Sequence, residues 1–205
     1  MPRAGIKYGS IAKPDYTALR QEAEQAAMAA LGLERPEDAV GKVRPDDLVV
    51  KAADAVRQAD AELALHQDER DAALTSLWFY DPRYGLVESS GLGTMAYRDA
   101  IAKRVYGDKK HKLPAAESNE ELARVGRELG VTQLEDAEEK LLESAPITFQ
   151  ARIRRSIALR YMQEAVFALG RPPYNWKPEK IAEHAGVTRK LVYKHRDTAA
   201  KRHGM

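Results

Sequence analysis

The sequence predicts an all-α protein, and three observations support that prediction. Alanine, leucine and glutamate, which favour helices, are abundant along the chain. Runs of β-branched residues are scarce, and no stretch alternates apolar and polar residues for long enough to indicate a strand. The predicted organisation is a helical N-terminal region over 1–112, an acidic helical connector over 113–145 and a basic C-terminal domain over 146–205.

The charge of the chain is distributed unevenly. The whole sequence has a formal charge of +2, but residues 151–205 contain thirteen Lys and Arg against four Asp and Glu. This segment therefore carries +9 and the remainder carries −7. Such an asymmetry indicates that the C-terminal end is suited to a polyanion.

Length and composition narrow the class of protein. The chain has 205 residues, 44% of them hydrophobic, which suits one large domain or two small ones. It contains no cysteine, which excludes disulfides and thiolate metal sites. The first residues lack the apolar core of a secretory signal, and no stretch approaches the roughly 20 apolar residues that span a bilayer. We expect a soluble cytoplasmic protein with no membrane partner.

The first helix is predicted from Thr17 to Leu31. Its apolar residues form one stripe, and Gly32 provides a C-terminal stop. The expected role of this helix is packing.

A second helical pattern runs from Asp46 to Tyr80. Asp81-Pro82 should end it, because proline disfavours helical geometry in the residue before it. His66 and Arg70 interrupt the apolar stripe, so we prefer two helices that meet near His66 over one long helix.

The segment from Glu117 to Glu143 is acidic, with nine Asp and Glu against three Lys and Arg. Leucine and valine residues at helical spacing flank the turn "ELGVT", so the segment should fold as a helical connector. Its negative face would repel phosphates, which makes it a poor nucleic-acid surface.

The stretch "IAEHAGVTRKLVYKHR", from Ile181 to Arg196, predicts two helices that meet at a corner. The first helix should end near Ala185, and Gly186 permits a left-handed turn with positive φ. Val187 should return to the core and Thr188 should cap the next helix. This arrangement is a helix-turn-helix.

The second helix of this corner would present donors from its exposed first turn. In the major groove, Arg and Lys read the acceptor edge of guanine, while other bases neutralise phosphates. The predicted DNA-binding side chains are Thr188, Arg189, Lys190, Tyr193, Lys194, His195, Arg196 and, ahead of the corner, Lys177.

The stretch from "RRSIALRYMQEAVFALG" through "IAEHAGVTRKLVYKHR" resembles the three-helix DNA-binding domain of TetR-type repressors. That pattern has an apolar helix ending in glycine, an Ile-Ala, an Ala-Gly-Val followed by Ser or Thr, and a Leu-Tyr pair, whose place Val192-Tyr193 fill here. The resemblance covers about the last quarter of the chain. It implies a DNA-binding corner, but TetR-type proteins carry this domain first, and the aromatic expected after the tyrosine is Arg196.

The loop "RPPYNWKP" is a further departure from that pattern, and Trp176 is expected to pack there as a core anchor. We therefore transfer the corner and its DNA-facing positions, and no effector binding.

An earlier stretch, residues 68–105, resembles in part the helix-turn-helix segments of actinobacterial and phage regulators. If Gly91 is the turn glycine, Leu86, Leu92 and Tyr97 should occupy buried positions. The second recognition helix would then carry Thr94, Met95, Arg98 and Lys103. Val87 stands where alanine is usual. The alternative is an ordinary helical core with a glycine-bearing loop.

No catalytic or metal-binding motif is apparent in the sequence. The five histidines do not pair with one another or with carboxylates at metal-ligand spacing, and the serines have no identifiable base. We therefore expect no enzymatic activity, no metal and no cofactor.

The function predicted is sequence-specific binding of double-stranded DNA by a bacterial, nucleoid-associated transcriptional regulator. One alternative is a plasmid, phage or chromosome-maintenance factor. Another is a protein-interaction adaptor that docks through its acidic connector, and the basic helix could also solubilise the chain or contact RNA. The sequence is compatible with a homodimer and does not specify an operator or an effector.

Overall fold

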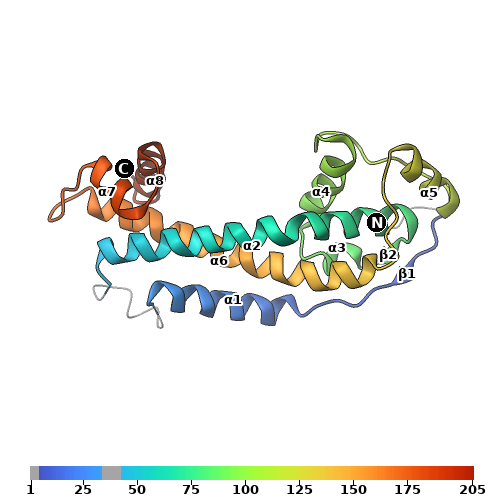
Figure 1. Ribbon diagram of the computed structural model, residues 1–205, viewed down its shortest axis with the longest axis horizontal. Helices are drawn as coiled ribbons and strands as arrows, with labels where there is room; N and C mark the ends of the chain where they lie inside the picture. The colour runs from blue at the N-terminus through green and yellow to red at the C-terminus, as the bar shows by residue number, and fades with distance from the viewer. Residues whose placement is uncertain (1–4, 34–42) are drawn as a thin grey trace. The chain divides into compact units, whose positions relative to one another are not determined.

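The computed structural model describes residues 5–33 and 43–205, and within them the chain is mostly helical (Figure 1). The predicted all-α character is therefore confirmed. The helices are α1 (Tyr16–Leu31), α2 (Pro45–Tyr80), α3 (Leu86–Ser89), α4 (Thr94–Tyr106), α5 (Asn119–Glu128), α6 (Ala137–Leu169), α7 (Pro178–Ala185) and α8 (Arg189–Arg202).

Two strands of two residues each, β1 (Gly9–Ser10) and β2 (Arg83–Tyr84), pair in parallel with Gly9 opposite Arg83. No pattern in the sequence predicts this pair. β2 directly follows Pro82, which accepts a hydrogen bond from the Gly9 backbone N–H at 3.0 Å. A contact between segments so far apart leaves no periodic pattern in the sequence.

The chain forms two compact units, each assembled from two separated segments. Unit 1 combines the chain up to Leu19 with residues 62–149, and unit 2 combines residues 20–61 with 150–205. α1, α2 and α6 each contribute residues to both units. The division predicted from the sequence, into 1–112, 113–145 and 146–205, differs because it assigns each stretch of chain to one region. Changes of composition and charge along the sequence cannot show that separated segments pack together.

α1 has the predicted packing stripe. Ala23, Ala27 and Leu31 are buried, and Gly32 adopts a φ of 72° directly after the helix. The predicted first helix and its glycine stop are therefore confirmed.

α2 is one continuous helix, so the preferred pair of helices meeting near His66 is wrong. The interruption of the apolar stripe at Arg70 is a buried charge, because this side chain is only 1% exposed. Its Nη2 lies 2.5 Å from Asp71 Oδ1, and its Nη1 donates to Thr148 Oγ1 at 3.1 Å. A buried charge is tolerated when it is paired and hydrogen-bonded, so the helix continues. Asp81-Pro82 ends α2, as predicted.

The acidic segment also folds as predicted, into helix, turn and helix. Ser118 caps α5 by accepting from the Glu121 backbone N–H at 3.1 Å, and Leu122 is buried. Gly130 has a φ of 71° in the turn after α5. The acidic segment is thus packed by its leucines into the core of unit 1 and exposes most of its carboxylates, so it is a part of that unit rather than a connector between domains.

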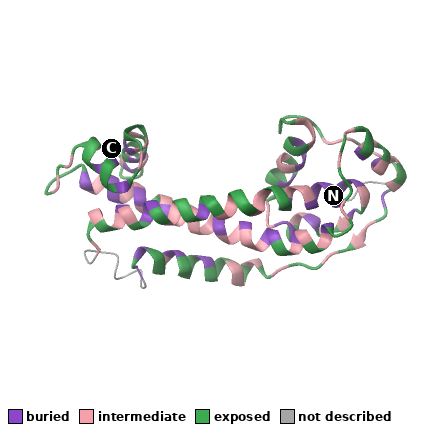
Figure 2. Cartoon of the chain, in the orientation of Figure 1, coloured by how far each residue is buried: buried purple, intermediate pink, exposed green. Residues whose placement is uncertain are grey.

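Each unit has its own apolar core, and Figure 2 shows how buried and exposed residues alternate along the helices. The core of unit 1 is built from α2, α3, α4, α5, α6 and the N-terminal segment; its largest fully buried members are Leu74, Phe79, Ile101, Leu122 and Leu141. The core of unit 2 is built from α2, α6, α7, α8 and the end of α1; its members include Leu31, Leu33, Val49, Met162, Leu169, Ile181 and Val192.

Candidate nucleic-acid interface

The predicted corner in unit 2 is formed by α7, a short turn and α8 (Figure 1). Gly186 follows α7 with φ 62° and ψ 39°, which confirms the predicted left-handed turn. Its N–H donates to the Glu183 carbonyl at 3.2 Å, and the Val187 N–H donates to the Ala182 carbonyl at 3.0 Å. These two bonds satisfy carbonyls at the end of α7, as in other helices that end on a left-handed glycine.

The corner is fixed by apolar packing on its inner side. Ile181, Ala182 and Ala185 of α7 and Val192 of α8 are buried, the most exposed being Ala182 at 8%. Val187 is partly buried against the same core, as predicted. Since both helices pack into the core of unit 2, the direction of α8 is set by the fold rather than by its own charges.

Both helices of the corner have defined starts. Pro178 occupies the first turn of α7, where its missing N–H costs nothing. Thr188 caps α8, as predicted, because its side-chain oxygen accepts from the Leu191 N–H at 3.3 Å. Thr188 is therefore a structural cap as well as a member of the predicted contact set.

The first turn of α8 exposes Arg189 and Lys190. The Arg189 side chain is 59% exposed, and its Nε lies 2.9 Å from Glu179 Oε1 of α7. Its Nη2 donates to the Tyr193 hydroxyl at 3.0 Å. This hydrogen bond and the charge of Glu179 raise the pKa of Arg189 above its usual value. The guanidinium is thus held from both helices of the corner.

One turn further along α8, Tyr193 lies beside two cations. Its ring centroid is 5.5 Å from Cζ of Arg189 and 5.1 Å from Cζ of Arg196, distances at which a cation is attracted to an aromatic face. Lys190, Lys194 and Arg196 are exposed. The solvent side of α8 therefore carries positive charge over two turns.

The expectation that His195 points outward with these bases is wrong. The residue is 4% exposed, and its Nε2 is buried without a hydrogen-bond partner. Burial, together with the charge of Lys194, lowers the pKa of His195. Helical spacing places it on the face of α8 that also carries Val192 and Ala199, three and four residues away, so it belongs to the packed side.

The start of α7 presents a second pair of basic side chains, Lys177 and Lys180. Lys177 is exposed at the position that precedes α7. Nζ of Lys180 lies 3.8 Å from the Trp176 ring centroid, and Trp176 is partly buried against the core of unit 2. Trp176 therefore packs as an anchor, as predicted, and also holds a lysine on the exposed side of α7.

The stretch singled out in unit 1 also forms a corner. Gly91 has a φ of 64° between α3 and α4, and Leu86 and Tyr97 are buried at 4% and 8% exposure. Thr94 and Arg98 are exposed on the first turns of α4, as predicted, and Met95 is 72% exposed. The glycine turn and the expected burial of Leu86 and Tyr97 are confirmed. Leu92, expected to be buried as well, is only partly buried.

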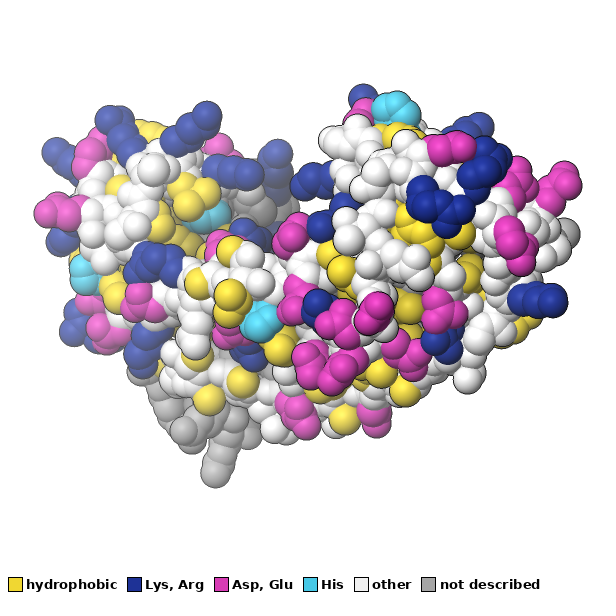
Figure 3. Space-filling model, turned by 45° about the vertical axis from the view of Figure 1, so that its right-hand side comes forward, with side chains coloured by type: hydrophobic (Ala, Val, Ile, Leu, Met, Phe, Trp, Pro, Cys, Tyr) yellow, Lys and Arg dark blue, Asp and Glu magenta, His cyan; other side chains and the backbone are white. Residues whose placement is uncertain are grey.

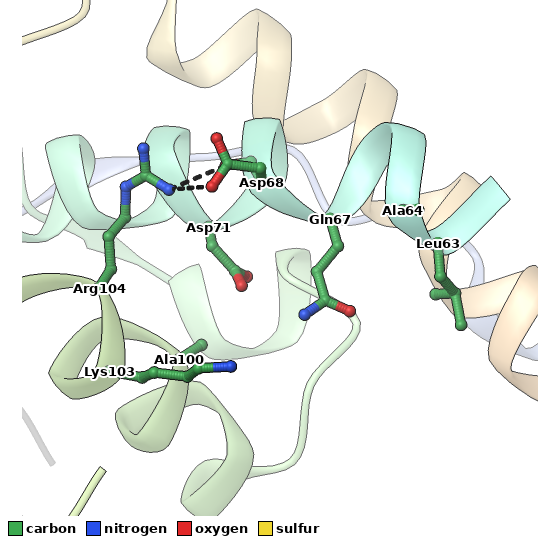
Figure 4. Close-up of a pocket in the computed structure, with 8 residues that line it drawn as sticks. All are labelled: Leu63, Ala64, Gln67, Asp68, Asp71, Ala100, Lys103 and Arg104. Atoms are coloured by element: carbon green, nitrogen blue, oxygen red, sulfur yellow. Dashed lines mark hydrogen bonds and ion pairs between the residues drawn. The ribbon is translucent and has the colours of Figure 1, made fainter. Parts of the chain in front are cut away.

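Figure 4 shows how the far half of α4 meets α2. Arg104 turns toward α2 and donates from Nη1 to Asp68 Oδ1 at 2.6 Å. Gln67 and Asp71 point from α2 into the space beside Lys103 (Figure 4). Arg104 is therefore engaged in a surface ion pair with Asp68, and Arg98 and Lys103 are further exposed bases of α4.

Glu179 and Met95 also lie at these surfaces. Glu179 was not predicted there, and Met95 was predicted only as a member of the second recognition helix. Glu179 lies in the first turn of α7 and meets Arg189 only because the corner folds. Met95 reads as a core residue by its chemistry, and only the position of Gly91 indicates that it faces solvent. The charge pattern alone identifies neither.

Comparisons with protein families, with curated proteins and with solved structures find no match for this chain. Among the residues that the structure describes, no three His, Asp or Glu side chains gather as a metal site. In the same residues, no helix has the length and apolar character needed to cross a membrane.

Proposed function

We propose that this chain is a sequence-specific double-stranded DNA-binding protein that reads the major groove with α8. The observation that carries the proposal is the exposed first turn of α8, which presents Arg189 and Lys190 from a corner fixed by Gly186 and its packed helices. A recognition helix enters the major groove by its N-terminal residues. Arginine and lysine there match the O6 and N7 acceptors of guanine.

The surrounding charges support phosphate contacts. α8 contains six basic residues and one acidic residue. Lys177 and Lys180 add positive charge at the start of α7, next to the first turn of α8 in the corner. Phosphate contacts of this kind supply affinity and register, whereas the first turn of α8 supplies sequence selectivity.

The biological role that this activity suits best is a transcriptional regulator at the bacterial nucleoid, in the cytoplasm and with no cofactor. A plasmid, phage or chromosome-maintenance factor would use the same corner and differ in where its sites lie in the genome. The resemblance of the last quarter of the chain to TetR-type domains supports DNA as the ligand of α8 under both roles.

A protein-interaction adaptor remains the competing class, and one observation favours it. Five carboxylates surround a shallow hollow beside Leu142 in the acidic part of the chain: Glu135, Asp136, Glu138, Glu139 and Glu143. Such a surface suits a basic protein partner and repels DNA.

Titration of labelled duplex DNA with the full-length protein at several salt concentrations separates the two classes. Binding through α8 releases counterions, so the logarithm of affinity should fall linearly with the logarithm of salt, with a slope of about −0.9 per phosphate neutralised. Lys190→Glu should weaken binding, and Glu139→Lys in the acidic hollow should not. Absence of duplex binding at low salt would contradict the proposal.

A further inference from the structure

The corners of the two units share one backbone plan at a constant offset of 95 residues. Gly91 and Gly186 have φ values of 64° and 62°, and two residues later Gly93 and Thr188 are both extended, with φ −71° and −76°. The N–H of Gly91 donates to the Glu88 carbonyl at 3.3 Å, as the N–H of Gly186 donates to Glu183 at 3.2 Å.

The N–H of the residue after the turn glycine is also linked to α7 or α3 in each corner, directly in unit 2 and through a serine hydroxyl in unit 1. In unit 2 the Val187 N–H donates directly to the Ala182 carbonyl. In unit 1 the Leu92 N–H donates to Ser90 Oγ at 3.3 Å, and this hydroxyl donates to the Val87 carbonyl at 2.7 Å. Ser90 thus bridges the Leu92 N–H and the Val87 carbonyl, the two groups that correspond to the Val187 N–H and the Ala182 carbonyl. Val87 takes the place of the small Ala182 in this corner.

The exposed positions of the two second helices correspond as well. Thr94, Met95 and Arg98 of α4 lie 95 residues before Arg189, Lys190 and Tyr193 of α8, and all but the half-buried Tyr193 are exposed. The residue between them, Tyr97 in α4 and Val192 in α8, is buried in each corner. α4 therefore presents its first turns to solvent from the same kind of corner as α8.

The chemistry on α4 differs from that on α8. Its first turn offers the methyl group of Thr94 and the 72% exposed Met95, followed one turn later by the guanidinium of Arg98. In the major groove, apolar side chains contact the C5-methyl group of thymine, and arginine reads guanine. A surface with two apolar contacts and one arginine suits a thymine-containing site.

Positive charge for phosphate contacts lies at the other end of α4. Lys109, Lys110 and Lys112 follow the helix, and the ring of His111 stacks on Tyr106 with centroids 5.0 Å apart. The stack holds this segment against the C-terminal end of α4. On the unit 1 side of Figure 3, Lys and Arg side chains gather beside a hydrophobic patch, whereas carboxylates dominate lower on the same face.

From this correspondence we propose that unit 1 carries a second duplex-DNA-binding surface, on α4 and residues 107–112, which reads a thymine-containing site different from the site of α8. One chain then binds two DNA segments and can bridge two duplexes. The inference deepens the proposed function, and it stands on residues that the reading of α8 does not use.

Selection from a random duplex library tests the proposal in the full-length protein. Wild-type protein should enrich two motifs. Arg189→Ala with Lys190→Ala should keep only the thymine-containing motif, and Met95→Ala with Arg98→Ala should keep only the other. Each pair should weaken binding to its own motif about tenfold or more.

A bridging measurement complements the selection, with one selected duplex on a bead and the other labelled in solution. The Met95 and Arg98 pair should abolish capture of the labelled duplex, whereas Arg124→Ala, which removes one charge from α5 in the same unit, should leave capture unchanged. Thermal melts establish that each variant is folded.

The outcomes separate the two proposals. If the α4 pair kept both motifs and full capture while the α8 pair lost its motif, bridging would come from two copies of α8 and the second surface would be refuted. If only the α4 pair had an effect, the assignment of α8 would fail and the surface on α4 would stand.

Discussion

The two corners have the same backbone and different surfaces. In both, a left-handed glycine, an extended residue two positions later and a buried residue in the first turns of the second helix set the geometry. The exposed positions differ, with Arg189 and Lys190 on α8 and Thr94 and Met95 on α4. A few buried positions and one left-handed glycine thus specify the corner. The exposed positions can vary without changing the backbone, and they determine which ligand the corner binds.

The largest expected effect concerns the two turn glycines. A Cβ at Gly91 would lie 2.9 Å from Cε1 of Tyr16, whereas the nearest atom at Gly186 is Nη1 of Arg57 at 3.4 Å. Gly186→Val should cost about 1–3 kcal/mol of unfolding free energy from the left-handed backbone. Gly91→Val should cost about 1–3 kcal/mol more, because it also overpacks against a ring.

Urea unfolding of both variants measures this difference. A larger loss for Gly186→Val than for Gly91→Val would show that the close contact with Tyr16 does not exist in solution.

The next effect concerns how each corner is anchored. The Tyr16 hydroxyl donates to the Ser89 carbonyl at 2.7 Å, and burial raises the pKa of Tyr16 to about 12. In unit 2, Arg57 Nη1 reaches the Ala185 carbonyl only at 3.4 Å. Tyr16→Phe should therefore cost about 1 kcal/mol, and Arg57→Ala less. Hydrogen exchange of the amides around each turn would report the loss locally, and equal losses would remove the distinction.

A smaller effect concerns the caps of the two second helices. Thr188 caps α8 with its side chain, while Gly93 occupies the same place before α4 and has open space where a Cβ would lie. Thr188→Ala should cost about 1 kcal/mol, and Gly93→Ser should stabilise the protein by about 0.5 kcal/mol. Melting temperatures of the two variants should move in opposite directions, and a loss of stability in Gly93→Ser would mean that α4 starts elsewhere.

The smallest expected effect is a pH dependence of stability that arises in unit 2, from His195. Burial and Lys194 lower the pKa of His195, so the unfolded chain binds the proton more readily than the folded one. The neutral ring is favoured at pH 8, and stability should fall as the pH drops below about 6.5, the value for an exposed histidine. His195→Phe should flatten this part of the stability curve. An equally steep fall in the variant would assign the proton to another group.

Much of the fold could be predicted from local patterns. Gly32, Gly186 and Thr188 end or start helices by chemistry that acts within a few residues, and all three behave as predicted. The prediction of a break near His66 was wrong because the sequence does not distinguish a buried arginine from an exposed one. Thr148, which accepts a hydrogen bond from the buried Arg70, lies 78 residues away.

The candidate site, like the fold, could be predicted where local patterns determine it. Helical spacing after the turn predicts the exposure of Arg189 and Lys190. The same spacing places His195 on the face of Val192, and the error came from grouping His195 with the neighbouring bases by charge. The contact between Glu179 and Arg189 required the folded corner. Pairing of distant segments into two units was outside the reach of composition and charge.

The central claim is that the first turn of α8 reads DNA, and matched variants test it most directly. Arg189→Ala and Lys190→Ala are compared with Arg160→Ala, which removes one exposed charge from α6 in the same unit. Fluorescence anisotropy on a selected duplex and on a scrambled one should show a loss of about 1–3 kcal/mol for each α8 variant on the selected duplex. Arg160→Ala should bind the two duplexes as the wild type does. Wild-type affinity and selectivity in both α8 variants, with unchanged melting curves, would contradict the account.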